Sequence, residues 1–282
     1  MNRYLKAFFQ ISLLFSFFFI FMQKKPISLE DVEVSLLYVC DLQGNFVFDE
    51  EGQKGIAVLS ELKRRENEKF LGNRGISLLV TSGRFTEDTV GTNISLLSKV
   101  PFDAALIGEE ELSYLEENPN LQKLKLPIIA RRTNKIASPM EKIVSSKGIN
   151  LWIGGDLSVI DPEKVKNINA FFVFKENNEK FFTLSDEEIE KRKKVLSRIQ
   201  SNKPNIPIFI VSPSSNENSY SYEGFVYQVK CPLGNTGEIG KLSLYYRQGE
   251  LIRQKQGFVQ LNTKKRNGSW IEPNESLLEN DF

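Results

Sequence analysis

Apolar and polar residues alternate in a regular order after about residue 26. Short apolar runs rich in β-branched residues indicate buried strands, and stretches with an apolar residue every three or four positions indicate amphipathic helices. Repeated strand–loop–helix units predict an α/β fold with parallel strands. In the first half, strands are predicted at 34–40, 76–80, 104–107 and 127–130, and helices at 55–69, at 92–100 and from 111 to 115.

The second half of the chain is richer in strand patterns. A helix is predicted at 186–200, where an acidic start and a basic end match the helix dipole. Residues 262–282 are polar and predict a loose tail. Strands are predicted at 150–153, 170–174 and 207–211, followed by a closing antiparallel set at 225–230, 240–246 and 258–261 with Gln248-Gly249 as a hairpin turn.

Residues 1–25 have the pattern of a targeting or anchoring segment. Arg3 and Lys6 precede an apolar run at 7–22, which is long for a signal-peptide core and short for a spanning helix of about 20 residues. No small-residue cleavage site precedes Pro26, which favours an uncleaved signal anchor, a membrane helix, over a removed signal peptide. A buried helix of the globular domain is a third alternative. We expect a domain at 26–261 to work outside the cytoplasm, on the periplasmic side of the cell envelope.

The charged residues and the missing histidine argue against some classes of partner and of catalytic site. The 282 residues include 37 basic and 36 acidic side chains, a net charge of +1, which argues against a nucleic-acid partner held by a strong positive field. Four basic residues at 191–194 on the predicted helix favour a solvated face over an anionic-lipid patch. The chain has no histidine, so Ser-His-Asp and Cys-His catalysis and imidazole-ligated metal sites are excluded.

Two cysteines are present, Cys40 and Cys231. In an exported chain they can form a disulfide. Both lie in strand-like apolar runs with nothing local to bring them together, so the sequence favours two separate buried thiols and leaves the disulfide as the alternative.

Polar residues follow the first three predicted strands. Asp41 comes after the first strand, Gly83 and Arg84 after the second, and 108–111 after the third. Because parallel strands end at the same edge of a sheet, these residues are predicted to lie on one rim, where the sites of α/β sheets form.

The segments on this rim resemble, in order, the motifs of the 5′-nucleotidase branch of the calcineurin-like metallophosphoesterases. Residues 41–46 resemble that family's Asp-x-His-Gly-His-Phe, 78–85 its Gly-Asp after a strand, and 102–112 its Asp-Ala-x-x-x-Gly-Asn-His-Glu. Residues 229–244 are similar to its tract ending in Leu-Gly-Arg-Leu-x-Leu. The resemblance spans about 34–261. It implies a two-sheet sandwich flanked by helices and the hydrolysis of phosphate esters with two divalent metals.

The matching motif positions depart from the family's metal ligands. They are Asp41, Gln43, Gly83, Arg84, Gly108, Glu109, Glu110, Glu111, Ser212 and Ser214. Of the ligands that the resemblance implies, only the aspartate at 41 is retained. Gln43 replaces the first histidine, Arg84 the bridging aspartate, and Glu109 and Glu110 an asparagine and a histidine. A serine-proline loop at 211–215 stands where a histidine-bearing loop is expected.

These substitutions predict that the two-metal reaction is lost. Two metals clamp both oxygens of an in-line phosphoryl displacement, and a guanidinium at the bridging position repels cations. We therefore expect no cofactor and no catalytic residue. An oxygen-only site for Ca²⁺ or Mg²⁺ at Asp41, Glu109 and Glu110 is a weaker alternative.

Arg84 suggests what replaces the metals. By hypothesis, its guanidinium pairs with Asp41 and with Glu109 or Glu110, offsetting carboxylate charge that two cations would otherwise neutralise. The competing interpretation is that all four are ordinary solvated loop charges. An unchanged or raised melting temperature of Arg84→Asp would count against the pairing.

The sequence thus predicts an envelope protein of metallophosphoesterase-like fold, acting as a binding or scaffold module. Its expected partners are the membrane, through residues 1–25, and an unknown protein or anionic ligand in the old cleft. An active phosphoester hydrolase with a remodelled, histidine-free site and a purely structural surface protein are the alternatives.

Overall fold

The computed structural model describes eleven parts of the chain, and the fold is given for these alone. They are residues 32–42, 58–71, 75–83, 98–118, 127–130, 141–155, 160, 167–174, 186–202, 205–213 and 225–261. The anchor predicted at 1–25 and the tail predicted at 262–282 lie outside them. None of the helices in the described parts has the length and apolar character needed to cross a membrane.

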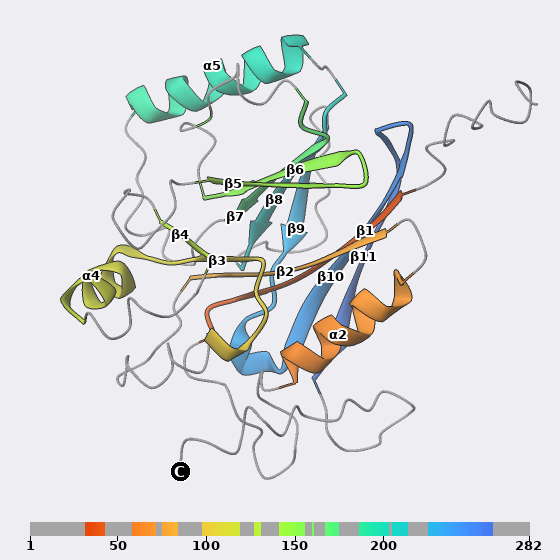
Figure 1. The fold of residues 1–282 in the computed structure, drawn as a ribbon. Helices are drawn as coiled ribbons and strands as arrows, with labels where there is room; N and C mark the ends of the chain where they lie inside the picture. Colours follow the sequence, from red (N-terminus) through yellow and green to blue (C-terminus); the bar gives the residue numbers. More distant parts are fainter. Residues whose placement is uncertain are drawn as a thin grey trace, which may run out of the picture.

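One six-stranded sheet, here sheet A, carries the predicted rim (Figure 1). Its strands run in the order β11-β10-β1-β2-β3-β4. Strands β1, β2, β3 and β4 run parallel to one another. The long hairpin β10–β11 adds to the sheet through β10, which pairs antiparallel with β1. The strands are β1 (Val32–Cys40), β2 (Gly75–Ser82), β3 (Ala104–Leu106), β4 (Ile128–Ile129), β10 (Glu238–Arg247) and β11 (Glu250–Gln260).

A second sheet of five strands, sheet B, packs against sheet A (Figure 1). Its order is β5-β6-β7-β8-β9, with β5 antiparallel to β6 and the other pairs parallel. The strands are β5 (Glu141–Ser146), β6 (Ile149–Gly154), β7 (Ala170–Phe174), β8 (Ile208–Ser212) and β9 (Val226–Lys230).

Three described helices cover the outer faces of the two sheets. Helices α2 (Leu59–Lys69) and α4 (Glu109–Glu117) pack on sheet A, and α5 (Asp186–Asn202) packs on sheet B (Figure 1). The result is a four-layer arrangement of helix, sheet, sheet and helix.

Strand β1 shows why the sheet lies in the middle of the molecule. Side chains alternate across a strand, and here both sets are mostly apolar and nearly all buried. Leu36 and Tyr38 are fully buried in the core between the sheets, whereas Leu37 and Val39 are fully buried against the helix layer. A strand with no polar face needs protein on both sides.

The two-sheet sandwich flanked by helices is confirmed, and so is the Gln248-Gly249 turn, where both residues have positive φ. The predicted antiparallel closing set is wrong in one strand, since β9 is a parallel edge strand of sheet B. Its alternating burial is what an exposed edge produces in either orientation.

The sequence analysis also missed strand β5. Its residues are only partly buried, so they lack an apolar run. The turn that follows carried a usable signal. Lys147 and Gly148 have φ of 52° and 79°, the combination that a two-residue hairpin turn requires and that an Xaa-Gly pair supplies.

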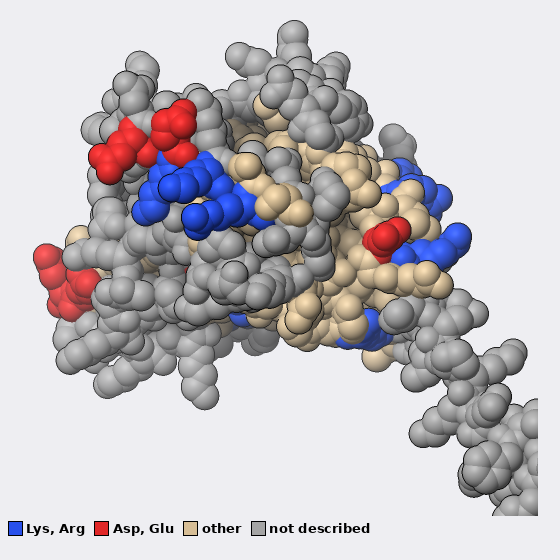
Figure 2. All heavy atoms as spheres, turned by 90° about the horizontal axis from the view of Figure 1, so that it is seen from above, with Lys and Arg blue, Asp and Glu red and all other residues tan. Residues whose placement is uncertain are grey.

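The basic run at 191–194 lies on α5. Its described members, Lys191 and Lys194, are exposed, and so are Glu187 and Glu190 on the same helix. On the face seen in Figure 2, basic groups lie beside acidic ones. Mixed charge of this kind fits the predicted solvated face.

Candidate functional site at the carboxyl ends of the strands

The carboxyl ends of β1, β2 and β3 meet on one edge of sheet A. The amide of Asp41 donates to the carbonyl of Ser82 at 2.8 Å, and that of Gly83 donates to Leu106 at 3.1 Å. These bonds continue the ladder by one residue beyond each strand. They place Asp41, Gly83 and the start of α4 at neighbouring positions, as the parallel arrangement predicts.

Asp41 is held tightly at this edge. It is 4% exposed and has φ of 47°, in the left-handed region that few residues other than glycine adopt. Its Oδ1 lies only 2.0 Å from where a Cβ on Gly83 would stand. Gly83 itself has φ of 87°. The carboxylate therefore packs directly on a backbone that only glycine can supply.

The third strand leads straight into a helix start. Gly108 is the residue before α4, and its carbonyl accepts the amide of Leu112 at 3.1 Å. Glu111 is 6% exposed, and its Oε2 lies 3.0 Å from the Cβ position of Gly108. The acidic first turn of α4 suits the positive end of the helix dipole.

Several predicted site residues cannot be placed. Gln43, Arg84 and Ser214 lie outside the described residues, as do the side chains of Glu109 and Glu110. The pairing of Arg84 with the carboxylates therefore stays a prediction.

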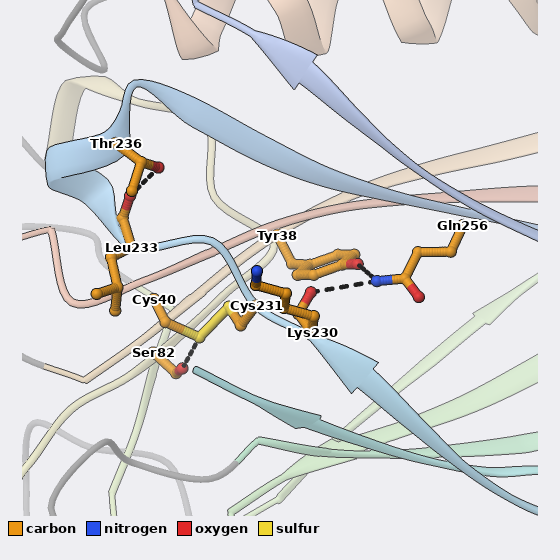
Figure 3. The surroundings of a disulfide bond; sticks show 8 residues. All are labelled: Tyr38, Cys40, Ser82, Lys230, Cys231, Leu233, Thr236 and Gln256. Atoms are coloured by element: carbon orange, nitrogen blue, oxygen red, sulfur yellow. Dashed lines mark hydrogen bonds between the residues drawn. A yellow bond between two sulfur atoms is a disulfide. The ribbon is translucent and has the colours of Figure 1, made fainter. Parts of the chain in front are cut away.

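The connection from sheet B back to sheet A passes over this edge. We call residues 231–237, between β9 and β10, the crossover. Cys231, its first residue, is bonded to Cys40 at the end of β1, with the two Cα atoms 5.9 Å apart (Figure 3). The expectation of two separate thiols is thus wrong. The partners are 191 residues apart in sequence and meet only because the two sheets pack together.

Backbone contacts fix the crossover on β1 beside the disulfide. The amide of Cys40 donates to Pro232 at 3.0 Å, and the amide of Gly234 donates to Asp41 at 3.2 Å. A Cβ on Gly234 would lie 2.6 Å from the Cα of Leu42, so no larger residue fits there. The crossover and the Asp41 segment are in direct backbone contact.

Sheet B contributes Ser212 to the same region. It is 8% exposed at the end of β8, and its carbonyl accepts the amide of Cys231 at 2.9 Å. A second serine, Ser82 of β2, places its Oγ 3.2 Å from the Cys40 sulfur (Figure 3). The disulfide thus has a hydroxyl beside it and connects the carboxyl ends of β1 and β9.

A buried charge network that the sequence analysis missed lies between α2 and sheet A. Lys63 is 5% exposed and donates to Asp103 Oδ2 at 2.8 Å and to the carbonyl of Ser77. Glu66 is 2% exposed and accepts from Lys241 at 2.7 Å and from Ser35 at 2.9 Å. Lys69 also pairs with Glu66.

Burial and pairing pull the pKa values of this network in different directions. Burial lowers the pKa of Lys63, and the charge of Asp103 opposes that shift. Burial raises the pKa of Glu66, but hydrogen bonds from Lys241 and Lys69 outweigh it, so the pKa of Glu66 lies below its usual value. One signal was available in the sequence: Lys63 and Glu66 stand beside Leu59 and Leu62 on the buried stripe of α2.

No family model and no curated protein sequence matches this chain. Solved structures do match in shape. The sulfate thiohydrolase SoxB of Thermus thermophilus aligns over 87% of this chain and 59% of its own, with a TM-score of 0.55 and 11% identity. A putative 5′-nucleotidase of Staphylococcus aureus aligns over 87% of this chain and 57% of its own, at 0.53 and 10%. The calcineurin-like phosphoesterase YfkN of Bacillus subtilis aligns over 88% and 95%, at 0.51 and 13%.

This chain has the calcineurin-like phosphoesterase fold. The predicted resemblance is confirmed at the level of the fold, which is what identities of this size establish. The chain spans less than three fifths of the length of SoxB and of the putative 5′-nucleotidase.

The described residues do not supply ligands for the two divalent metals that the resemblance implies. Imidazole is absent from the sequence, and the thiolates of Cys40 and Cys231 are consumed in a disulfide. Among the described residues, no three acidic or cysteine side chains stand close enough to hold a metal ion. The Asp41 carboxylate packs on Gly83 instead.

Proposed function

We propose that this chain is a calcineurin-like phosphoesterase module that has lost the two-metal reaction and serves as a binding or scaffold module of the cell envelope. The observation that carries the proposal is the donor set at the strand ends. The edge keeps the fold's geometry and one buried aspartate, but it lacks every imidazole that the resemblance implies.

The crossover supports the same proposal. It lies in backbone contact with Asp41 and Leu42, and Gly234 leaves no space between the two segments. A carboxylate that is 4% exposed and packed on Gly83 is poorly placed to bind a solvated cation. A partner would therefore contact the rim around Asp41 rather than Asp41 itself.

The disulfide supports a place outside the cytoplasm. Disulfides persist in oxidising compartments and are rare where glutathione and thioredoxin keep thiols reduced. We propose that residues 1–25 hold the module on the membrane as a signal anchor, with 26–261 on the periplasmic side. The partner on that side is a protein or an anionic ligand.

An activity and metal assay on the full chain tests the proposal. The purified protein is offered nucleotide and aryl-phosphate substrates with Mn²⁺, Mg²⁺ or Ca²⁺, and its bound metal is counted. The expected result is no metal-dependent turnover and sub-stoichiometric metal. Asp41→Asn and a matched change of an exposed carboxylate, Glu187→Gln, should behave like the wild type.

The competing hydrolase has a distinct signature. Metal-dependent turnover that Asp41→Asn abolishes and Glu187→Gln leaves intact would overturn the proposal and establish a remodelled, histidine-free site. If neither activity nor any partner bound by the wild-type chain is found in the cell envelope, the purely structural interpretation replaces it.

A further inference from the structure

The Cys40–Cys231 bond is placed where the two sheets and the candidate site meet. Cys40 is the last residue of β1 in sheet A, and Cys231 follows the last residue of β9 in sheet B. Each residue is 1% exposed, and both belong to the core between the sheets. The bond therefore fixes the crossover, rather than a surface loop, against β1 (Figure 3).

Apart from the disulfide, the crossover is attached to sheet A at its two ends. At its start are the isolated bridge between Cys40 and Leu233 and hydrogen bonds from the amides of Cys40 and Gly234, and at its end the amide of Leu261, after β11, donates to the carbonyl of Gly237 at 2.7 Å. Its only regular element is a three-residue 3₁₀ turn, η4 (Gly234–Thr236). A strand in a ladder has a bond at nearly every residue, so the start of this segment relies on its covalent link more than a paired strand would.

The segment under the crossover is held in a conformation that needs support. Asp41 has φ of 47°, a left-handed backbone that aspartate tolerates better than most residues and that its surroundings help to hold. The amide of Gly234 and the close backbone of Leu42 belong to those surroundings. Loosening the crossover removes restraints from Asp41 directly.

We propose that the Cys40–Cys231 disulfide is a redox-operated latch on the candidate site. With the bond formed, the crossover covers Asp41 and Leu42. A dithiol reductant opens it by two thiol–disulfide exchanges. The first thiolate attacks one sulfur and releases the other as a thiolate, which takes up a proton. The reductant's second thiolate then attacks the reductant sulfur of this mixed disulfide. This closes the reductant into a cyclic disulfide and releases the other cysteine as a thiolate, which also takes up a proton. The crossover then moves away, and Asp41 and Leu42 become exposed.

The latch does not depend on what the module binds. Its test measures backbone opening and not activity or partner binding, so its failure and the failure of the proposed function are distinguishable.

Amide hydrogen exchange with a short labelling pulse tests the latch. The oxidised full chain is compared with the double variant Cys40→Ser/Cys231→Ser. The expected result is at least about tenfold faster exchange at Cys40 or its serine replacement, Asp41 and Gly234, while the amides of β6 stay protected. Leu151→Ala, which weakens the core between the sheets on β6, is the matched control and should leave the crossover amides slow.

A second measurement covers the case in which the double variant does not fold. Wild-type protein is treated with dithiothreitol in native buffer, and thiol release and exchange are followed together. Release of two thiols with opening confined to the crossover supports the latch. Three results overturn it: crossover exchange unchanged after reduction, equal opening of β6 and the crossover, or a bond that resists dithiothreitol until denaturant is added.

Discussion

At the scale of single residues, the contact between Asp41 and Gly83 decides the shape of the rim. The carboxylate lies where a side chain on residue 83 would begin, and both residues have positive φ. Each therefore limits what the other can be. An aspartate side chain is short enough to turn back onto the next strand, and glycine is the residue that leaves it room.

Gly83→Ala should lower the free energy of unfolding by about 2 kcal/mol or more, because it adds a clash to an unfavourable φ. Urea unfolding followed by circular dichroism measures the change. Gly257→Ala on β11 is the control, since its new Cβ meets nothing within 4 Å, and it should alter stability little. Equal effects of the two substitutions would show that the Asp41 contact does not restrict residue 83.

Glu66 makes a residue-scale prediction about acid stability. Its pKa is lowered in the folded state, so below the ordinary value of 4.5 the unfolded chain binds the extra proton. The stabilisation is thus present above about pH 4.5 and is lost as the pH falls through the folded-state pKa. Glu66→Gln should cost about 3 kcal/mol at pH 7, because it removes the buried carboxylate that Lys241 and Lys69 both pair with.

As the pH is lowered from 5, the melting temperature of Glu66→Gln should fall less than that of the wild type. Thermal unfolding at a series of pH values measures both. Glu68→Gln is the control, since Glu68 is half exposed beside Arg64 and a surface pair contributes little. Parallel pH profiles of the wild type and Glu66→Gln would rule out the role given to this carboxylate.

At the scale of elements, Asp103 connects three of them. Its Oδ2 accepts from Lys63 of α2 and from the amide of Leu79 of β2, and its carbonyl accepts from Lys142 of β5. Asp103, the residue before β3, thus attaches both α2 and the edge strand β5 of sheet B to sheet A.

Asp103→Ala should destabilise the protein by about 3 kcal/mol, because it leaves Lys63 buried without its carboxylate. The double variant Asp103→Ala/Lys63→Met should recover part of that loss, since an apolar side chain of similar length needs no partner. Chemical unfolding of the four proteins of this double-mutant cycle measures both effects. Strictly additive losses would show that the two residues do not depend on each other.

The elements that the sequence predicted are those whose burial is visible in their own residues. β1 and β2 are rich in apolar residues and buried nearly throughout, and the parallel arrangement that follows from them brings Asp41 and Gly83 together. The strand β5 and the orientation of β9 were missed or misjudged because edge strands are half exposed. The sequence left the disulfide as the less favoured alternative, since no local pattern records that two sheets pack there.

At the scale of the whole molecule, backbone and side-chain links join the two sheets in addition to the core that they share. The crossover leads from sheet B to β10, and Asn169 near β7 donates to the carbonyl of Gly249 at the tip of the β10–β11 hairpin at 2.8 Å. That hairpin is thus fixed to sheet B at its turn as well as to β1 along its length. Loss of the hairpin would remove a neighbour of β1 and a contact of sheet B together.

The position of β1 also has a consequence for the order in which the ribosome makes the chain. β1 is among the first elements to emerge, but its partner β10 is among the last. Until β10 arrives, β1 is an edge strand with no polar face, the kind of edge that pairs with other chains.

A chain that ends at Lys230 should therefore sediment as aggregates, because β1 is left as an exposed edge strand. Centrifugation of freshly synthesised chains measures this. A soluble truncated chain would show that something other than β10 protects β1. If it does aggregate, the newly made protein needs a chaperone for nearly the whole of its synthesis.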